Sequence, residues 1–334
     1  MQTEKGMEVS KYKKYLLTSL LLILVYISAF IFQVVFISPP PPSEGVEVLY
    51  WINNCKEIKE DLILKVEGPK IIFNGGSNTL FNVRTEDITE ALGVPTYNLA
   101  IHWDLGMHFF IEESKPLLNE GDVIILPLQI THFSTNQKST KLAFDYYNLY
   151  EPDKAGRISY LDRVNFSFQN NPLNYIIDRT LGILSPIEMV MDEGNYSSSD
   201  LNQHGDQTNH TGNLLKKASP FPVPNLKETL SLKKLKDFNY WCKENGILLF
   251  VTYASMVKFD DYEQEAYLAY FEFLEQYFME NYIKVIGTPW DFMFDIHLFY
   301  DHDQHMHQGG MTKNTKKLIQ MMKEIDIVGM MTAA

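Results

Sequence analysis

Cysteine and positive charge are both scarce in this 334-residue chain. Its two cysteines, Cys55 and Cys242, are too few for a disulfide framework or a cysteine-based zinc site, so they form either one bridge or two separate thiols. Lys and Arg number 29 against 42 Asp and Glu, which gives a formal net charge of −13. Nucleic-acid-binding proteins usually carry a basic face. We therefore expect no nucleic-acid partner.

Charge is missing altogether from residues 15–37, a run rich in Leu, Ile, Val and Phe. The run is long enough to cross a bilayer as a helix. Residues 1–14 hold four lysines and two glutamates, and this positive excess places them in the cytoplasm and the rest of the chain on the periplasmic or extracellular side. The alternative, a cleaved signal peptide, has a shorter apolar core and a small-residue cleavage site. Pro39–Pro42 follow instead, so we expect an uncleaved signal anchor and a Pro-rich spacer at 38–45.

Beyond the spacer, short apolar runs alternate with amphipathic stretches. Helices are expected at 46–65, through Ile88 and Leu92, from about Asp104, from Leu226 to Gly246, at about 262–282 and at 312–325. The apolar runs predict strands at 70–73, 94–101, 123–128, 247–253 and 283–286. Three consecutive strand–helix units indicate an α/β fold with a doubly wound parallel sheet.

The alternation stops between residues 131 and 224. This segment contains aromatic patches, a second apolar piece at 175–184 and a polar tract rich in Ser, Asn, Gln and His at 195–213. A structureless loop of this length is uncommon inside a compact domain. We therefore expect one extracytoplasmic domain at 46–334, with an insertion, part helix and part mobile loop, at about 131–224.

The first expected strand leads directly into Gly75-Gly76-Ser77-Asn78. Two consecutive glycines favour a sharp turn with positive φ, which puts Ser77 between a strand and a helix. Open α/β sheets bind ligands at this carboxyl edge, and the free N–H groups of the next helix can stabilise an oxyanion there. Ser77 is therefore a candidate nucleophile, although the same residues also suit a plain turn.

A second polar block, Phe299 to Gly310, follows the last expected strand and contains two aspartates and three histidines. A serine nucleophile needs a base to take its proton and a third group to orient that base, and one loop here can supply both. The same residue types also suit a zinc or other transition-metal site. We expect no metal and no cofactor, because His204 and His210 are the only candidates for further ligands.

Together the two blocks resemble those of the SGNH (GDSL-type) hydrolase superfamily. More specifically, they resemble membrane-anchored SGNH-like proteins of bacterial surface-polysaccharide O-acylation, such as those of alginate O-acetylation and teichoic-acid D-alanylation. The likeness covers about residues 45–130 and 225–325 and implies a flavodoxin-like fold. The residues that match the family's blocks are Gly75–Asn78, Tyr97–Ala100, Leu105-Gly106, Gly121–Val123 and Phe299–Gly310.

On this resemblance, Ser77 is the nucleophile, His305 the general base and Asp301 its orienting carboxylate. His307 and Asp303 are the alternates for the last two roles, because Met306 and His307 replace the family's usual Leu-Asn. The family's oxyanion hole usually contains a Gly, where this chain has Ala, and an Asn, where the third expected strand ends in Leu-Pro-Leu-Gln. The candidate oxyanion and substrate residues are Asn78, Ala100, Gly106 and Gln129.

The resemblance implies an acyltransferase or carbohydrate esterase that adds or removes O-acyl groups, acetyl by default, on a bacterial surface polysaccharide through an acyl-serine intermediate. It also implies a partner, a polytopic membrane-bound O-acyltransferase that brings the acyl group across the bilayer. The competing interpretation is a catalytically degenerate SGNH-like subunit that binds glycan or scaffolds a modification or export complex. The missing oxyanion Asn and the crowded histidines favour that alternative.

Overall fold

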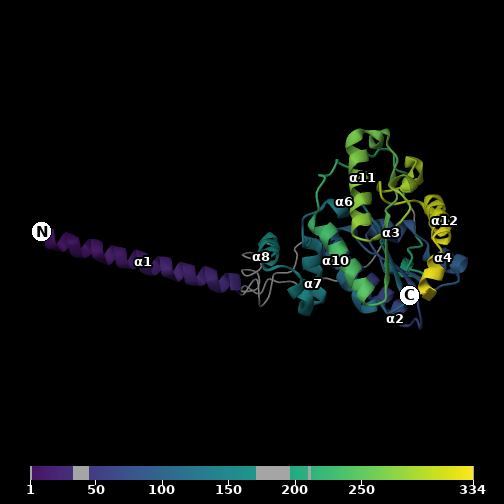
Figure 1. The fold of residues 1–334 in the computed structure, drawn as a ribbon. Coiled ribbons are helices and arrows are strands. Elements are labelled where there is room, and N and C mark those ends of the chain that lie inside the picture. Colours follow the sequence, from purple (N-terminus) through teal and green to yellow (C-terminus); the bar gives the residue numbers. More distant parts are fainter. Residues whose placement is uncertain (1, 33–44, 171–195, 210–211, 334) are drawn as a thin grey trace. The chain divides into compact units, whose positions relative to one another are not determined.

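The computed structural model describes residues 2–32, 45–170, 196–209 and 212–333 (Figure 1). The chain divides into two compact units. One comprises Met1–Gly45 and Tyr147–Glu188, and the other comprises Val46–Tyr146 and Met189–Ala334. The segment that we expected as one insertion at 131–224 is thus shared between the two units.

The first unit contains a long apolar helix, α1 (Gln2–Phe32). Its segment Lys11–Phe32 has a mean hydropathy of 2.4 and is not buried against any other described part of the chain. One helix in the described residues is therefore long and apolar enough to cross a membrane, which is consistent with the predicted anchor. The end of the expected span at 33–37 and the proline spacer lie outside the described residues, as does the apolar piece at 175–184. The other described elements wholly within this unit are the 3₁₀-helix η4 (Pro152–Arg157) and helix α8 (Tyr160–Gln169).

The second unit is built on a five-stranded, wholly parallel sheet in the order β2-β1-β3-β4-β6. This is the 2-1-3-4-5 order of flavodoxin-like doubly wound sheets, so the predicted α/β class with a parallel sheet is confirmed. All residues of the two central strands β1 and β3 are buried, which explains their unbroken apolar sequences. The strands are β1 (Ile71–Phe73), β2 (Thr96–Asn98), β3 (Val123–Leu128), β4 (Leu248–Tyr253) and β6 (Lys284–Ile286).

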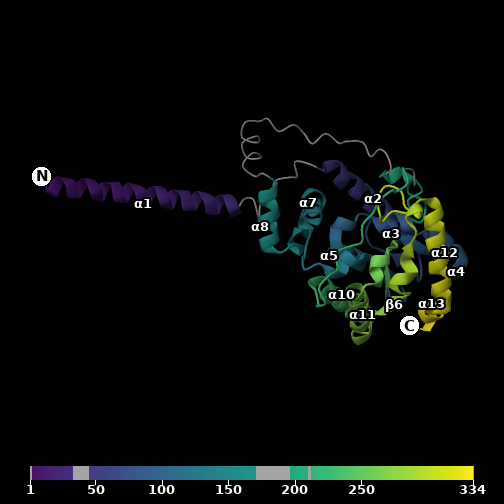
Figure 2. The ribbon, with the colours of Figure 1, turned by 90° about the horizontal axis from the view of Figure 1, so that it is seen from above.

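Helices cover both faces of this sheet. Figure 2 shows α5, α10 and α11 on one side and α3, α4 and α12 on the other. The helices of this unit are α2 (Val46–Leu64), α3 (Ser77–Asn82), α4 (Thr85–Leu92), α5 (Gly106–Ser114), α6 (Ile130–Ser134), α10 (Leu230–Glu244), α11 (Glu265–Glu280), α12 (Gln308–Glu324) and α13 (Ile327–Ala333). Helix α7 (Lys141–Tyr150) spans the boundary between the units. The 3₁₀-helices are η2 (Trp103–Leu105), η3 (Lys115–Leu117), η5 (Ser198–Asp200), η6 (Asp260–Glu263), η7 (Pro289–Phe292) and η8 (Ile296–Leu298).

Several element boundaries differ from expectation. The strand expected at 94–101 has only three residues, and the helix expected from Asp104 begins at Gly106, after a 3₁₀ turn. A second parallel sheet, β5 (Met256–Val257) with β7 (Met293–Phe294), was not predicted because two-residue strands show no periodicity. Helix α13 follows the helix that we expected to close the chain.

The two cysteines are buried and form no disulfide bond. Cys55 lies on α2 and Cys242 on α10. Of the two alternatives left open by the sequence, the structure therefore has the unbridged one.

The described part of the polar tract, 196–209, is fastened to the edge of the sheet. The Asn98 N–H donates to the His204 carbonyl at 2.8 Å, which continues the pairing beyond β2. The buried Lys59 ammonium donates to the carbonyls of Asn98 and Gly205 at 2.8 and 2.6 Å, and burial lowers the pKa of Lys59 to about 8. This tract, which we expected as a loop, is thus held by backbone and side-chain bonds, and it brings Tyr196 to the carboxyl edge of the sheet.

Candidate active site

The turn between β1 and α3 is shaped by close backbone approach. A Cβ atom at Gly76 would lie 2.5 Å from the Trp103 Cα, and one at Gly75 would lie 2.7 Å from Thr79 Oγ1. Gly76 itself has an ordinary φ of −87°, so our expectation of positive φ at this pair was wrong. Gly76 is required because the loop that carries Trp103 packs against the turn. At Gly75 the crowding comes instead from the Thr79 side chain and the Pro127 carbonyl.

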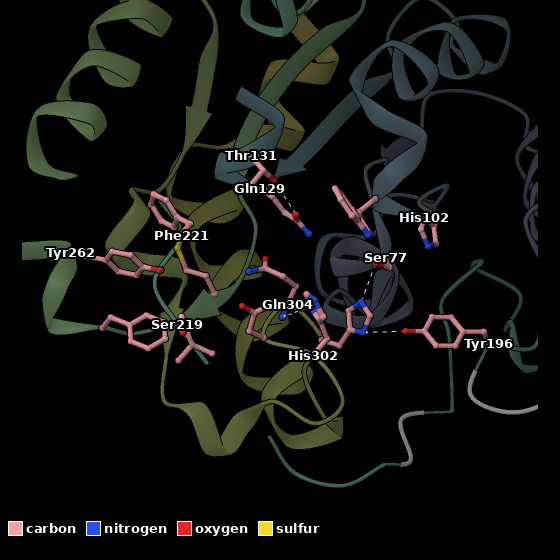
Figure 3. A pocket seen from close by; sticks show the side chains of 16 residues that line it. Ser77, His102, Gln129, Thr131, Tyr196, Ser219, Phe221, Tyr262, His302 and Gln304 are labelled. Carbon is pink, nitrogen blue, oxygen red and sulfur yellow. Dashed lines mark hydrogen bonds and ion pairs between the residues drawn. The ribbon is translucent and has the colours of Figure 1, made fainter. Parts of the chain in front are cut away.

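Ser77 and His305 meet across 228 residues of sequence. The Ser77 hydroxyl donates to His305 Nε2 at 2.9 Å, the bond drawn as a dashed line from Ser77 in Figure 3. His305 Nδ1 donates in turn to Asp301 Oδ1 at 3.1 Å. Ser77 and His305 are 3% and 5% exposed. The structure therefore brings together the three residues predicted as nucleophile, base and orienting carboxylate, with spacings suited to nucleophilic catalysis.

Asn82, the last residue of α3, holds the loop that carries His305. Its side-chain oxygen accepts the Met306 N–H at 2.8 Å, and its Nδ2 donates to the Gln304 carbonyl at 2.8 Å. These two bonds bracket His305 on both sides. The same helix thus starts with the predicted nucleophile, Ser77, and ends with the residue that holds the loop of the predicted base, His305.

Asp301 is kept ionised by its neighbours. Burial acts to raise its pKa, but the hydrogen bond and charge of His305, together with a bond from Tyr196, outweigh burial and hold the pKa of Asp301 below its usual value. Tyr196 OH donates to Asp301 Oδ2 at 3.3 Å and lies 3.4 Å from His305 Nδ1. Burial, followed by the charge of Asp301, raises the pKa of Tyr196, so the phenol stays protonated and able to donate.

The two alternates for the base and the orienting carboxylate, His307 and Asp303, bond other groups. His307 caps helix α12 by accepting the Gly309 N–H at 2.9 Å, and its Nε2 donates to the His297 carbonyl at 3.0 Å. Asp303 pairs with His302 Nδ1 at 2.9 Å and so raises the pKa of that histidine. In this geometry His305 and Asp301, rather than His307 and Asp303, are the pair bonded in series to Ser77.

The four oxyanion candidates are divided between two places. Asn78 and Gln129 lie beside the nucleophile turn and are bonded to each other, with Gln129 Nε2 donating to Asn78 Oδ1 at 3.3 Å. The Ala100 N–H instead donates to Asn98 Oδ1 at 3.1 Å, and the Gly106 N–H donates to the Trp103 carbonyl. The amides of Ala100 and Gly106 are thus engaged elsewhere.

A pocket of about 370 Å³ opens over the Ser77–His305 pair. Figure 3 shows Ser77, His102 and Tyr196 at one end and the rings of Phe221 and Tyr262 at the other. Polar groups and apolar surface therefore share one cavity, as expected of a site that orients a substrate while burying part of it. The lining residues are Ser77, His102, Trp103, Gln129, Thr131, Tyr196, Ser219, Phe221, Met256, Val257, Phe259, Tyr262, His302, Asp303, Gln304 and His305.

The side chains of the histidine-rich loop, Phe299 to Gly310, do not form a metal-binding cluster. Within the described ranges, no group of three or more His, Cys, Asp or Glu side chains is placed to hold a metal ion. His204 stacks on Tyr97 and bonds the Thr96 carbonyl at 2.9 Å, away from the loop. His210, the other candidate ligand, lies outside the described residues.

Sequence reasoning missed several residues of this site: Asn82, His102, His132 and Tyr196. Each is a polar residue whose role depends on a partner far along the chain. The only local signal was the position of His102 and His132, each a few residues beyond an expected strand at the ligand-binding edge of the sheet. The chain matches no family model and no curated protein.

Proposed function

We propose that this chain is a membrane-anchored serine acyltransferase or esterase of SGNH type that acts on O-acyl groups of an extracytoplasmic bacterial polysaccharide. The observation that carries the chemistry is the Ser77–His305–Asp301 relay, with bonds of 2.9 and 3.1 Å, at the mouth of a pocket on the carboxyl edge of a parallel sheet. The resemblance of the sequence blocks to those of SGNH-like proteins of polysaccharide O-acylation is the basis for proposing a polysaccharide and an acyl group as substrates. Helix α1 supports anchoring.

The first half-reaction acylates the serine. His305 Nε2 takes the Ser77 hydroxyl proton as Oγ bonds to the ester carbonyl carbon, and the carbonyl π electrons move onto oxygen. When this oxyanion collapses, the carbon–oxygen bond to the alcohol breaks, and the leaving alcohol takes the proton from His305. Asp301 orients the imidazole and stabilises its positive charge. The product is an acyl ester on Ser77.

The second half-reaction reverses these steps with a new acceptor. A sugar hydroxyl or water gives its proton to His305 and attacks the acyl carbon, and Ser77 leaves with the proton returned. A sugar acceptor makes the protein a transferase, and water makes it an esterase. The exposed indole of Trp103 at the pocket beside Ser77 is suited to stack on a sugar ring.

The test is turnover of 4-nitrophenyl acetate by the full-length chain in detergent. We expect Ser77→Ala and His305→Ala to fall to background, a loss of about 10⁴-fold or more, while the exposed His297→Ala keeps wild-type activity. A fluorophosphonate probe should label the wild type and not Ser77→Ala. An inert wild type whose Ser77 takes no label would contradict the proposal and favour the glycan-binding or scaffolding subunit.

A further inference from the structure

The site described so far is short of oxyanion donors. Developing negative charge on the carbonyl oxygen is usually held by two or more preorganised donors. The Ser77 N–H, in the first turn of α3, donates to no other described residue and can serve as one. Of the four candidates predicted from the sequence, the amides of Ala100 and Gly106 donate elsewhere, and Asn78 Nδ2 donates to Thr79 Oγ1 and the Pro127 carbonyl. Gln129 Nε2 gives one of its two N–H groups to Asn78. Apart from the second N–H of Gln129, a further donor has to come from another part of the pocket.

His102 offers a free donor in the same pocket. Its Nδ1 accepts the Asp104 N–H at 3.2 Å. A nitrogen that accepts a hydrogen bond carries no proton, so the neutral ring has its proton on Nε2. Nε2 donates to no residue in the described parts of the chain, and the ring lines the pocket at its Ser77 end (Figure 3).

The surroundings of His102 favour its neutral form. Burial, together with the nearby His305, lowers the pKa of His102 to about 4. Near neutral pH the ring therefore keeps one fixed N–H and takes up no proton from the reaction. The rings of Trp51 and His102 meet edge to face at 6.4 Å, which restrains the imidazole.

The backbone beside His102 is locked against the nucleophile turn. The Trp103 Cα lies 2.5 Å from where a Gly76 side chain would begin, and the Trp103 carbonyl accepts from His132 Nε2 at 3.2 Å. His132 Nδ1 accepts the Gln129 N–H at 3.2 Å. The loop that carries His102 is thus tied on one side to α3 and on the other to the start of α6, which is the preorganisation that an oxyanion donor requires.

We propose that the Nε2–H of His102 is a donor of the oxyanion hole, acting with the Ser77 N–H in place of the usual asparagine, where this chain has Gln129 directly after β3. The inference rests on the proposed function, since it assigns a part of the same site. His102 exchanges no proton in the reaction. It only stabilises the negative charge that forms on the carbonyl oxygen in both half-reactions.

The test compares His102→Asn with His102→Gln in the full-length chain. The short Asn side chain can still accept the Asp104 N–H, as Nδ1 does, but it places no donor at the Nε2 position. The longer Gln side chain can place its amide N–H there. With 4-nitrophenyl acetate we expect a kcat about 10²- to 10³-fold lower for Asn, a largely unchanged KM, and a kcat for Gln at least tenfold above that of Asn.

The outcomes separate the inference from the proposed function. The inference is overturned if His102→Asn keeps kcat within threefold of wild type, or if Asn and Gln lose activity equally. Thermal unfolding of both variants shows whether a loss reflects the fold: a lower midpoint for Asn that accounts for its inactivity also overturns it. Loss of the proposed function itself appears differently, as wild-type activity that survives Ser77→Ala.

Discussion

The histidines in and behind the pocket come from two regions that surround them with opposite kinds of partner. In the loop after β7, His302 and His305 each bond a carboxylate, Asp303 and Asp301. In the segments that follow β2 and β3, His102 before η2 and His132 in α6 bond backbone groups and are desolvated, so that burial lowers the pKa of each to about 4. A carboxylate stabilises the imidazolium, whereas backbone partners and burial favour the neutral ring. One region can therefore accept a proton during turnover, and the other supplies fixed N–H donors.

The largest expected effect on activity separates two histidines of the first region, His305 and His307. We expect His305→Asn to lose about 10⁴-fold or more in kcat/KM, because the base is removed. His307→Asn should stay within a few-fold of wild type, because Asn is itself a good helix N-cap and His307 serves as the cap of α12. Ester hydrolysis by the two variants measures this. Equal losses of kcat/KM in the two variants would contradict the assignment of the base role to His305.

The carboxylates of the same loop should separate by a similar but smaller margin. Asp301→Asn replaces an acceptor of the His305 Nδ1–H with a group that can donate, which favours the wrong tautomer and should cost about 10⁴-fold in kcat. Asp303→Asn only removes the partner of His302 and should cost less than tenfold. Steady-state kinetics of both variants decide, with Asp303→Asn as the matched control. A deficit in Asp303→Asn as large as that in Asp301→Asn would exchange their roles.

In the second region, substitution of His132 should change stability rather than catalytic rate. In the unfolded chain His132 takes a proton below pH 6.5, but in the folded chain only below about 4. Between these values the unfolded state holds more protons, so the free energy of unfolding falls as the pH falls, by about 3 kcal/mol for this one group. The contribution is fully present above pH 6.5.

His132→Asn should therefore be less stable than wild type at pH 7, because it loses the bond to Trp103, yet decline less between pH 7 and pH 4. Urea unfolding at both pH values, followed by tryptophan fluorescence, measures the two slopes. His297→Asn, at an exposed position, should keep the wild-type slope. Parallel declines for wild type and His132→Asn would show that His132 is not the group that titrates.

The smallest expected effect belongs to Tyr196. Tyr196→Phe removes one hydrogen bond to Asp301 but keeps the ring contacts with Trp51 and Phe81. We expect kcat to fall about tenfold or less, with KM and the thermal midpoint unchanged. The ratio of kcat to that of wild type across pH 5 to 9 is the readout. A fall in thermal stability without a change in kcat would make Tyr196 a packing residue alone.

The sequence predicts most of the sheet, because β1, β3 and β4 are buried runs whose apolar composition is a local property. It also pairs Ser77 with the loop containing His305, because both follow strands and the edge of a parallel sheet collects such loops. These contacts are specified by topology. They need no knowledge of side-chain geometry.

The rest of the site depends on contacts that no local pattern encodes. Tyr196 reaches Asp301 from a polar tract that had the composition of a loop, and it is placed there by Lys59 and a backbone pairing beyond β2. Gly76 is required by Trp103, 27 positions away, rather than by its own φ. An amino-acid sequence does not reveal the tautomer of a histidine, so it could not distinguish His102 and His132 from surface histidines. The backbone groups that bond their rings in the structure make the distinction.

Helix α3 has a consequence beyond the placement of one serine. Ser77 opens this six-residue helix, and Asn82 ends it while bonding the loop on both sides of His305. One short helix thus connects the proposed nucleophile with the loop of the proposed base. We therefore expect a displacement of α3 to move Ser77 and the loop around His305 together. Local unfolding of α3 should then release the loop around His305 at the same time as it displaces Ser77. States in which only one of these two residues is in place should not be populated.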